Sequence, residues 1–381
     1  TLGLYANIRP CVAYAPYVKT KHPDMDVVIV RENEEDLYCG IEYRQTQNSF
    51  NALKVITRPG SEKIIRYAFD YAVSNKRKKV TCFIKDNILK LTDGEFHRIF
   101  DEIAKEYPQI QSEHWIVDIG AAKLADTPEV FDVIVMPNLY GDILSDVAAQ
   151  IAGSVGLAGS ANIGVSGAMF EAIHGSAPRR AGQNLANPSG LLLAAIMMLQ
   201  HVGLPKEASS IHNAWLKTLE DGIHTYDIFR EGLSKEKVGT KEFAQAVIAR
   251  LGQLPEKFKP VHYEKSAPQK HKDHSSGTKT KKELVGIDIY FDYSGDAESF
   301  AKKIEGLKPA IPLKQIFNRG VKVWPNTHPE TSLVDSWRAR FLSETPVDYE
   351  KVLTLQKQLA NLNIIQTQNL YTFDGAIGYS Q

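Results

Sequence analysis

The sequence has little of three features that often settle the class of a protein: cysteine, charge of one sign and long apolar runs. Only Cys11, Cys39 and Cys82 occur among 381 residues, too few and too scattered for a disulfide framework or a zinc cluster. This scarcity suits a reducing compartment such as the cytoplasm. The 45 basic and 45 acidic residues give a formal net charge of zero, so the chain has no overall electrostatic attraction to nucleic acid or to a membrane. The longest apolar stretch, LLLAAIMMLQHVGL, is too short to span a bilayer and predicts a buried helix.

Two signatures are also missing. No GxGxxG follows a strand, so the usual dinucleotide-binding fingerprint is absent. No signal peptide precedes the first residue, and TLGLYANIRP starts abruptly inside what reads as a structured element. We therefore expect a further segment before Thr1 in the natural protein.

The order of apolar runs predicts an α/β architecture in residues 1–254. Strand-like runs such as DVVIVRE, KVTCFIK and FDVIVMP alternate with helical patterns such as SEKIIRYAFDYAVSNK and DGEFHRIFDEIAKEY. Residues 255–283 contain almost no aliphatic side chains and many Lys, Pro and Ser, which predicts a solvated linker; contact of the basic run with a polyanion is the alternative.

Residues 284–381 predict a separate α+β module. Strands LVGIDIYF, PLKQIFN, GVKVWP and LYTFD and helices DAESFAKKIEGL and DYEKVLTLQKQLANLN give the order β-α-β-β-α-β, the split pattern of a ferredoxin-like module. Tyr290, Phe291 and Tyr293 resemble an RNA-stacking platform, but the second aromatic signature of RNA-recognition domains is absent. We expect these aromatics to serve a core or an interface.

The segment NLYGDILSDVAAQ sets Asp142 and Asp146 one helical turn apart behind an apolar strand. One interpretation is structural: Asp142 caps the helix and Asp146 lies in its first turns, where the dipole favours acids. The other is that both carboxylates bind a divalent cation. The segment alone does not separate the two.

Three basic residues stand near predicted strand ends. Arg31 ends the strand of VREN, Arg9 precedes a proline in NIRP, and Lys85 ends the strand that begins near Val80. An arginine so placed can bind a carboxylate bidentately, and a lysine can transfer a proton. Surface salt bridges and a solvated lysine are the structural alternatives.

The segment HGSAPRR, residues 174–180, predicts a tight polar loop. Its backbone N–H groups and small side chains would let a phosphate approach closely, and Arg179 and Arg180 add two positive charges. A loop rich in turn residues would explain the glycine and the proline equally well.

These motifs together resemble those of a known family. LYANIRP, VRENEEDLYCGIE, KDNILKLTDG, NLYGDILSD, MFEAIHGSAP and ANPSG occur in the order and spacing of isocitrate dehydrogenases and their β-decarboxylating relatives, the isopropylmalate, homoisocitrate and tartrate dehydrogenases. The likeness spans residues 1 to about 254. The stretches NRGVKVWP and VDSWRARF also resemble the C-terminal extension of a subgroup of isocitrate dehydrogenases.

The resemblance implies oxidative decarboxylation of isocitrate to 2-oxoglutarate with reduction of NADP. It implies proton transfer by Tyr38 and Lys85, substrate binding by Arg9 and Arg31, and Mg²⁺ or Mn²⁺ binding by Asp118, Asp142 and Asp146. In this family the residues that match Lys85 and Asp118 come from the neighbouring subunit, so a homodimer or higher homo-oligomer is expected, with neither nucleic acid nor membrane as a partner.

The resemblance also implies a cofactor site around the HGSAP loop. Its residues would be Asn87, His174, Gly175, Ser176, Ala177, Pro178, Arg179, Arg180, Asn187, Tyr226 and Arg230. Relatives selective for NAD carry an acid and an aliphatic residue at the positions of Arg179 and Arg180. Since this chain has four donors to a 2′-phosphate and no acid for the ribose hydroxyls, NADP is the expected cofactor.

The implied fold is a two-domain one. A small domain covers about residues 3–35 and 58–152, residues 36–57 form an interlocking β clasp, and residues 153–254 belong to the large domain. Segments that select the substrate lie upstream of Thr1 in relatives. A related dehydrogenase acting on another 2-hydroxy acid, or a non-catalytic regulatory subunit, remains an alternative function.

Overall fold

The computed structural model describes residues 2–264, 280–326 and 330–380. Contacts divide the chain into two compact units. The first comprises Thr1–Cys39 with Lys54–Ser275, and the second comprises Gly40–Leu53 with Ser276–Gln381. The finer division of the first unit into small and large domains stays a prediction.

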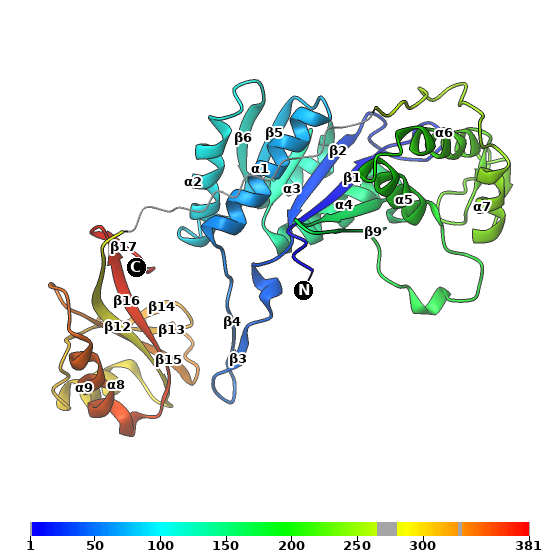
Figure 1. Ribbon diagram of the computed structural model, residues 1–381. Helices are drawn as coiled ribbons and strands as arrows, with labels where there is room; N and C mark the ends of the chain where they lie inside the picture. Colours follow the sequence, from blue (N-terminus) through cyan, green and yellow to red (C-terminus); the bar gives the residue numbers. More distant parts are fainter. Residues whose placement is uncertain (1, 265–279, 327–329, 381) are drawn as a thin grey trace. The chain divides into compact units, whose positions relative to one another are not determined.

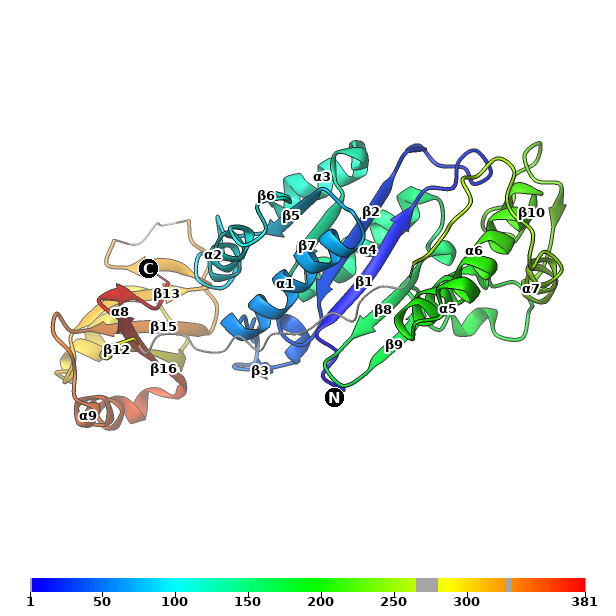
Figure 2. The same ribbon diagram turned by 45° about the horizontal axis from the view of Figure 1, so that its top comes forward.

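A seven-stranded mixed sheet forms the centre of the first unit, in the order β6-β5-β7-β2-β1-β8-β9 (Figures 1 and 2). Neighbours among β6, β5, β7 and β2 are parallel, whereas β1, β8 and β9 pair antiparallel. The strands are β1 Ala6–Val12, β2 Asp26–Glu32, β5 Lys79–Ile84, β6 Gln111–Ile116, β7 Val133–Met136, β8 Gly159–Ile163 and β9 Ala168–Ala172.

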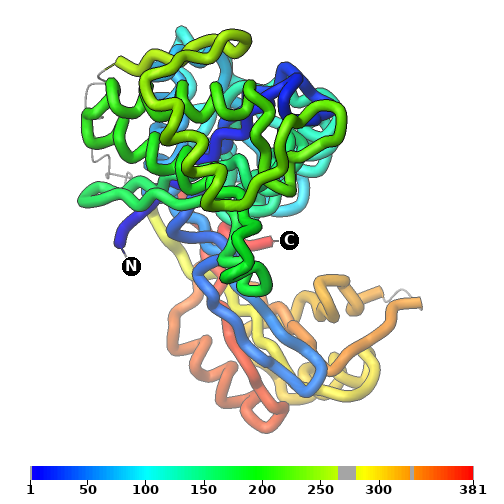
Figure 3. The backbone as a smooth tube through the Cα atoms, turned by 90° about the vertical axis from the view of Figure 1, so that its right-hand side faces the viewer, coloured from blue at the N-terminus to red at the C-terminus, as the bar shows by residue number. Residues whose placement is uncertain are grey.

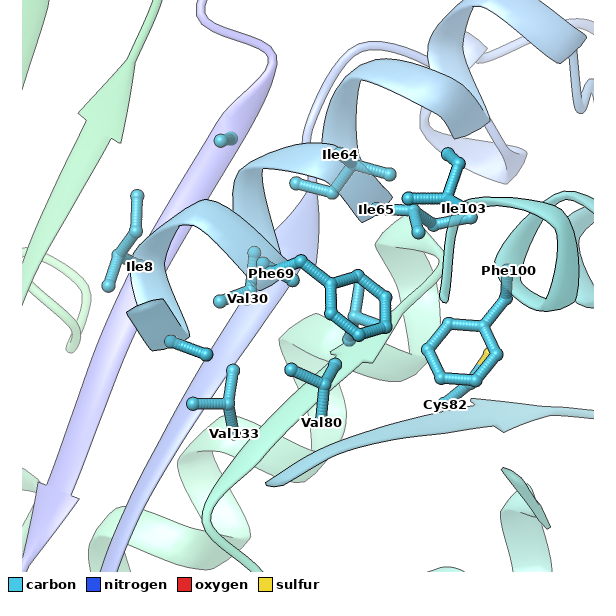
Figure 4. Packing of buried hydrophobic residues seen from close by; sticks show 14 of the residues in the cluster. Ile8, Val30, Ile64, Ile65, Phe69, Val80, Cys82, Phe100, Ile103 and Val133 are labelled. Carbon is cyan, nitrogen blue, oxygen red and sulfur yellow. The ribbon is translucent and has the colours of Figure 1, made fainter. Parts of the chain in front are cut away.

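Helices cover both faces of the parallel part, which explains why its central strands β2 and β7 are apolar without alternation, whereas the edge strand β6 is polar and partly exposed. In β2, Val28 and Val30 join the cluster beneath α1 and α2, while the intervening Ile29 joins the cluster beneath α3 and α4. Figure 4 shows the first cluster, in which Phe69 and Phe100 lie with ring centroids 5.5 Å apart. Each such fully buried side chain contributes about 1.5–3 kcal/mol.

The helices of this unit begin largely where the sequence predicts. The Thr57 hydroxyl caps α1 by accepting from the Gly60 N–H at 3.1 Å. Residues 191–204 do lie mostly in a helix, α5, but the prediction that it is buried is wrong in part: Leu191 and Met198 are exposed. The helices are α1 Arg58–Ser74, α2 Thr92–Ala104, α3 Val117–Asp126, α4 Asn138–Ala152, α5 Ser189–His201, α6 Pro205–Glu220 and α7 Thr240–Ile248, and β10 Ile223–His224 pairs with β11 Glu236–Lys237.

The first part of the predicted linker packs partly against this unit. Within 255–263 the prediction of a solvated segment fails at Pro255, Phe258, Val261 and Tyr263, which are buried or half-buried, whereas the other residues are exposed. The Glu220 carboxylate accepts backbone N–H groups of residues 256–258, and Asn213 exchanges two hydrogen bonds with the backbone of Val261. Phe258 packs onto the core beneath α6. Polar side chains of α6 and the rings of Phe258 and Tyr263 therefore hold a segment that has few aliphatic residues of its own. Residues 265–279 lie outside the described part of the chain.

The C-terminal part of the second unit is an antiparallel sheet in the order β14-β13-β15-β12-β16-β17, with two helices. A split β-α-β-β-α-β pattern is present, but its third strand is β15 and not GVKVWP, which forms the added edge strand β14. β15 escapes sequence inspection because Arg340 is buried in it, paired with Asp288 of β12 at 2.8 Å twice. The elements are β12 Lys282–Asp292, α8 Ala297–Gly306, β13 Leu313–Asn318, β14 Val321–Trp324, β15 Ser336–Leu342, α9 Tyr349–Leu359, β16 Ile364–Phe373 and β17 Ala376–Ile377.

A hairpin of β3 Glu42–Arg44 and β4 Phe50–Ala52 completes the second unit. Thr46 at its tip donates to Asp335 at 2.7 Å, and Gln45 is hydrogen-bonded to Gln366 of β16. In Figure 3 the blue hairpin accordingly lies beside the yellow and red strands. The hairpin occupies the predicted clasp segment; its interlocking with a second chain stays a prediction. Within the described ranges, no helix is long and apolar enough to cross a membrane.

Candidate active site

The predicted catalytic residues gather at one edge of the sheet. Arg31 lies near the carboxyl end of β2, Lys85 directly follows β5, and the helix that carries Asp142 follows β7. Because β2, β5 and β7 are parallel, their carboxyl ends meet at the same edge, where ligands bind in open α/β sheets. The topology therefore explains why residues so far apart in sequence share one region.

Arg31 is buried and is held in place by Asn138 at the start of α4. Its Nε and Nη2 donate to Asn138 Oδ1 at 2.9 and 2.7 Å, and its Nη1 pairs with Asp142. Gly141 makes room for this contact, since a Cβ there would lie 2.5 Å from Arg31 Cγ. Asn138 and Asp142 thus fix the orientation of the Arg31 guanidinium, whose Nη1 side faces the acidic face of α4.

Arg9 approaches the same helix face from the middle of β1. It donates from Nε to Asn7 at 2.5 Å and from Nη1 to the Ser145 hydroxyl at 2.6 Å. The Nη1 atom also lies 3.3 Å from Asp142 Oδ1 and 3.7 Å from Asp146 Oδ1. Burial and the nearby charge of Arg31 lower the pKa of Arg9. The neighbouring guanidinium groups of Arg9 and Arg31 are suited to bind a substrate with several carboxylates.

Tyr38 completes this group from the short 3₁₀ turn Leu37–Cys39. Its hydroxyl donates to Asp142 Oδ2 at 2.5 Å, and the Arg31 guanidinium lies 4.7 Å from its ring centroid. The hydrogen bond to Asp142 raises the pKa of Tyr38, so its proton stays in place at neutral pH. Burial raises the pKa of Asp142, but the Tyr38 hydroxyl and the two arginines outweigh it and hold that pKa below its usual value.

The structure argues against one of the two interpretations of this segment, the one in which Asp142 caps its helix. α4 already begins at Asn138, directly after Pro137, so Asp142 lies more than one turn inside it. Asp142 and Asp146 share a face, and each has an oxygen within 4 Å of the same Arg9 nitrogen. Burial raises the pKa of Asp146. Two carboxylates that converge in this way suit Mg²⁺ or Mn²⁺, which prefer oxygen ligands.

Lys85 and Asp118 form a second group. Lys85 Nζ donates to Asp118 Oδ2 at 2.7 Å, and this contact, with the Ile119 N–H, lowers the pKa of Asp118. Asp118 is 67% exposed at its side chain. Over the residues that the structure describes, no ligand group within one chain joins Asp118 to Asp142 and Asp146. Tyr38 and Lys85 therefore belong to two different hydrogen-bonded groups of the chain.

The predicted phosphate loop is exposed along residues 174–180. His174 contacts the Gly175 carbonyl at 3.0 Å, and Ser176 follows in the same open segment. Ala177 has φ of +43°, a left-handed conformation that turns the chain into the 3₁₀ segment Pro178–Arg180. The loop thus leaves both arginine side chains outside the core.

The structure brings only some of the other cofactor candidates together. The Arg180 guanidinium lies 4.8 Å from the Tyr226 ring centroid, across two segments that the sequence separates. Arg230 donates to the Phe229 carbonyl at 2.8 Å, and Asn87 is exposed just beyond Lys85. Asn187 is buried, and its side chain is taken up by Asp227 and the Ser189 N–H.

Sequence reasoning missed the residues that hold the catalytic ones in place. Asn138 and Ser145 fix the two arginines, and both lie on α4 beside Asp142. Buried Asp93 accepts from the Lys85 backbone N–H at 2.7 Å and is itself paired with Lys54 at 2.9 Å. The sequence signal was position alone, because Asn138 lies two residues after the end of β7.

Comparison with known proteins gives consistent matches over the chain. The sequence profile described as isocitrate/isopropylmalate dehydrogenase matches residues 1–247, and the profile described as bacterial isocitrate dehydrogenase, C-terminal domain, matches residues 282–381. The isocitrate dehydrogenase [NADP] of Rickettsia bellii is 55% identical over 390 aligned residues, which cover 100% of this chain and 80% of the relative.

Two solved structures share the fold. A crystal structure of a Thermus thermophilus protein superposes with a TM-score of 0.92 at 40% identity, covering 99% of this chain and 77% of that one. Isocitrate dehydrogenase from Methylococcus capsulatus gives a TM-score of 0.63 at 45% identity over 66% of this chain and 74% of its own. The α/β fold with a C-terminal antiparallel module is thereby confirmed.

Proposed function

The chain belongs to the isocitrate/isopropylmalate dehydrogenase family, and we propose that it oxidatively decarboxylates isocitrate to 2-oxoglutarate and CO₂ with reduction of NADP. The observation that carries this proposal is the convergence of Arg9, Arg31 and Tyr38 on Asp142. Two arginines bind substrate carboxylates, a phenol holds a proton beside them, and a carboxylate pair stands ready for a divalent cation.

The metal and the cofactor supply the chemistry that side chains lack. A bound divalent cation acidifies the substrate hydroxyl and stabilises negative charge on oxygen, and the nicotinamide accepts the hydride. Asp142 and Asp146 of one chain, with the partner subunit's Asp118, would hold the cation. The oxygen donors and the shared helix face support this assignment.

The chain's own residues handle charge and protons. Arg9 and Arg31 bind and orient the carboxylates, because their guanidinium groups are fixed by Ser145 and Asn138 before any substrate arrives. Loss of CO₂ from the β-keto acid leaves an enolate, and the Tyr38 hydroxyl donates the proton to its carbon. The partner subunit's Lys85 then restores the proton on Tyr38.

The assignment of Tyr38 to one chain and Lys85 to its partner implies an active site shared between two copies of the chain. Lys85 is bonded to Asp118 within its own chain and not to the group around Asp142. We therefore infer that two chains assemble so that the Lys85–Asp118 pair of each completes the Tyr38–Asp142 group of the other. A homodimer is the smallest assembly that satisfies this requirement.

The choice of NADP rests on the positive groups around the exposed loop. Arg179 and Arg180 stand on the loop, and the stacking of Arg180 on Tyr226 brings the second segment to it. With Arg230, these residues offer donors for a 2′-phosphate. The NADP-named Rickettsia relative supports the same choice.

The alternatives receive less support. A regulatory subunit is disfavoured because the catalytic set of Tyr38, Lys85 and the three metal-site aspartates is complete. A dehydrogenase for another 2-hydroxy acid is disfavoured by the match of residues 282–381 to the isocitrate dehydrogenase C-terminal domain.

The purified protein tests the proposal directly. With Mn²⁺ present, NADPH formation should require D-isocitrate and should be far slower with isopropylmalate, homoisocitrate or tartrate, as judged from kcat/KM. Preferential turnover of any of the other three substrates would refute the proposed substrate.

A further inference from the structure

Three metal-binding side chains meet outside the catalytic group. Asp86 follows β5, His97 lies on α2, and His114 lies on β6. One ligand atom from each lies within 4.8 Å of the other two. The three residues come from separate elements packed on one core, because β5 pairs with β6 and α2 covers β5. Strand pairing and helix packing therefore fix the positions of His97 and His114, and Asp86 lies in the turn directly after β5.

The distances are close to those of a first coordination shell. Asp86 Oδ2 lies 2.8 Å from His97 Nδ1, and the His97 and His114 ring centroids are 3.9 Å apart. Tetrahedral coordination at about 2.0–2.2 Å places ligand atoms roughly 3.3 Å from one another. Small side-chain rotations would thus suffice to bring the three atoms around one ion.

A second carboxylate stands behind the histidine. Asp101, one turn beyond His97 on α2, has an oxygen 3.6 Å from His97 Nε2. A metal-binding histidine usually donates its other ring N–H to a carboxylate, which fixes the ring and makes it more basic. At 3.6 Å Asp101 does not yet hydrogen-bond His97, but a small rotation of its exposed side chain would give this support without taking a coordination position.

The donor set selects the kind of metal. Two imidazoles and one carboxylate suit Zn²⁺ and similar transition metals, whereas Mg²⁺ prefers oxygen ligands and retains its water. The cluster therefore differs in chemistry from the carboxylate pair Asp142 and Asp146.

We propose that Asp86, His97 and His114 form a second metal site, which binds Zn²⁺, with Asp101 as its supporting carboxylate. The fourth coordination position is left for water, since His114 is exposed to solvent. Asp86 adjoins Lys85 in sequence, so an ion bound here ties the segment that carries Lys85 to α2 and β6. Without an ion, the same groups form a hydrogen-bonded Asp86–His97 pair next to the tilted ring of His114. That alternative predicts no Zn²⁺ uptake at this place.

Calorimetric titration with Zn²⁺ in excess Mg²⁺ separates these outcomes. The wild-type protein should bind one more equivalent of Zn²⁺ per chain than His114→Ala or Asp86→Asn. Co²⁺ in place of Zn²⁺ should give the visible absorption of a tetrahedral site in the wild type but not in His114→Ala or Asp86→Asn. Asp101→Asn should keep the site but weaken its affinity about 10–100-fold.

Controls distinguish the site from general uptake of Zn²⁺. His262→Ala, which removes an exposed histidine elsewhere, should bind as the wild type does. Without Zn²⁺, His114→Ala should turn over isocitrate as the wild type does. If neither protein turns over isocitrate, the proposed function fails, and the Zn²⁺ titration still tests the metal site independently. Equal stoichiometry and affinity in wild type, His114→Ala and Asp86→Asn would overturn the proposal.

Discussion

The Tyr38 hydroxyl donates to Asp142 Oδ2 at 2.5 Å, which joins the proposed acid to a proposed metal ligand. The other oxygen of the same carboxylate contacts both Arg9 and Arg31. One side chain therefore connects the groups proposed for substrate binding, metal binding and proton transfer. A cation or a substrate that alters the charge at Asp142 must also alter the hydrogen bond of Tyr38.

Replacement of Tyr38 by Phe tests the role of its proton. Turnover should fall by about 10²–10⁴-fold, the usual contribution of general acid catalysis, while KM for isocitrate changes little. Steady-state kinetics at saturating Mn²⁺ gives both constants. Tyr43→Phe, on an exposed tyrosine of the hairpin, should leave both unchanged. A Tyr38→Phe variant with kcat near the wild-type value would remove Tyr38 from the mechanism.

Strand ends were the most predictable part of the site. An apolar run that stops at a polar residue marks the edge of a buried sheet, and this logic correctly placed Arg31 and Lys85. The interpretation of Asp142 as a helix cap would begin α4 next to Gly141, whereas α4 begins at Asn138. The missing Cβ of Gly141 instead admits the Arg31 side chain, a tertiary contact that no local pattern reveals.

A buried charge explains why the sequence did not predict strand β15. Strand β15 contains two arginines, and only its pairing with β12 shows that Arg340 is neutralised inside the module by Asp288. Likewise, Asp86, His97 and His114 form no recognisable motif in the sequence, because their meeting depends on strand order and helix packing. Contacts between segments far apart in the sequence cannot be predicted from the periodicity of apolar residues.

Mixed dimers test whether the site is shared. Lys85→Met and Asp142→Asn should each be inactive alone, since either change impairs every site of a homodimer. A purified dimer with one chain of each kind has one intact site if Lys85 acts across the interface, and should recover roughly half of the wild-type activity. Differently tagged, co-expressed chains supply this species. An inactive mixed dimer of correct mass would place each site within a single chain.

Glu32, next to Arg31, predicts a pH dependence of stability. It is 1% exposed, and burial raises its pKa to about 7 despite backbone N–H donors from Glu34 and Glu35. Because the folded pKa is above the unfolded one, its contribution to stability is fully present below about pH 4.5 and is lost as pH rises through about 7. The loss should be on the order of 1–3 kcal/mol.

Denaturant unfolding at several pH values checks this expectation. Glu32→Gln cannot ionise and should lose less stability than the wild type between about pH 5 and 8. The exposed neighbour provides the control, since Glu34→Gln should follow the wild-type curve. Parallel curves for Glu32→Gln and wild type would show that Glu32 does not titrate in this range.

Cofactor selectivity should depend on the exposed arginines. Each charge-assisted contact to a phosphate contributes on the order of 1.5–3 kcal/mol when partly shielded, and less when exposed. Two or three such contacts from Arg179, Arg180 and Arg230 would give NADP a preference of at least about 100-fold over NAD.

The double variant Arg179→Asp/Arg180→Ile should weaken use of NADP far more than use of NAD. The new aspartate repels the 2′-phosphate but can accept hydrogen bonds from ribose hydroxyls, and loss of Arg180 also removes the contact with Tyr226. The measurement is kcat/KM for both cofactors with isocitrate. Arg319→Asp, in the C-terminal module, is the control for a charge reversal and should leave the ratio unchanged. If the wild type already favours NAD, or if the double variant loses both cofactors equally, the arginines do not select the 2′-phosphate.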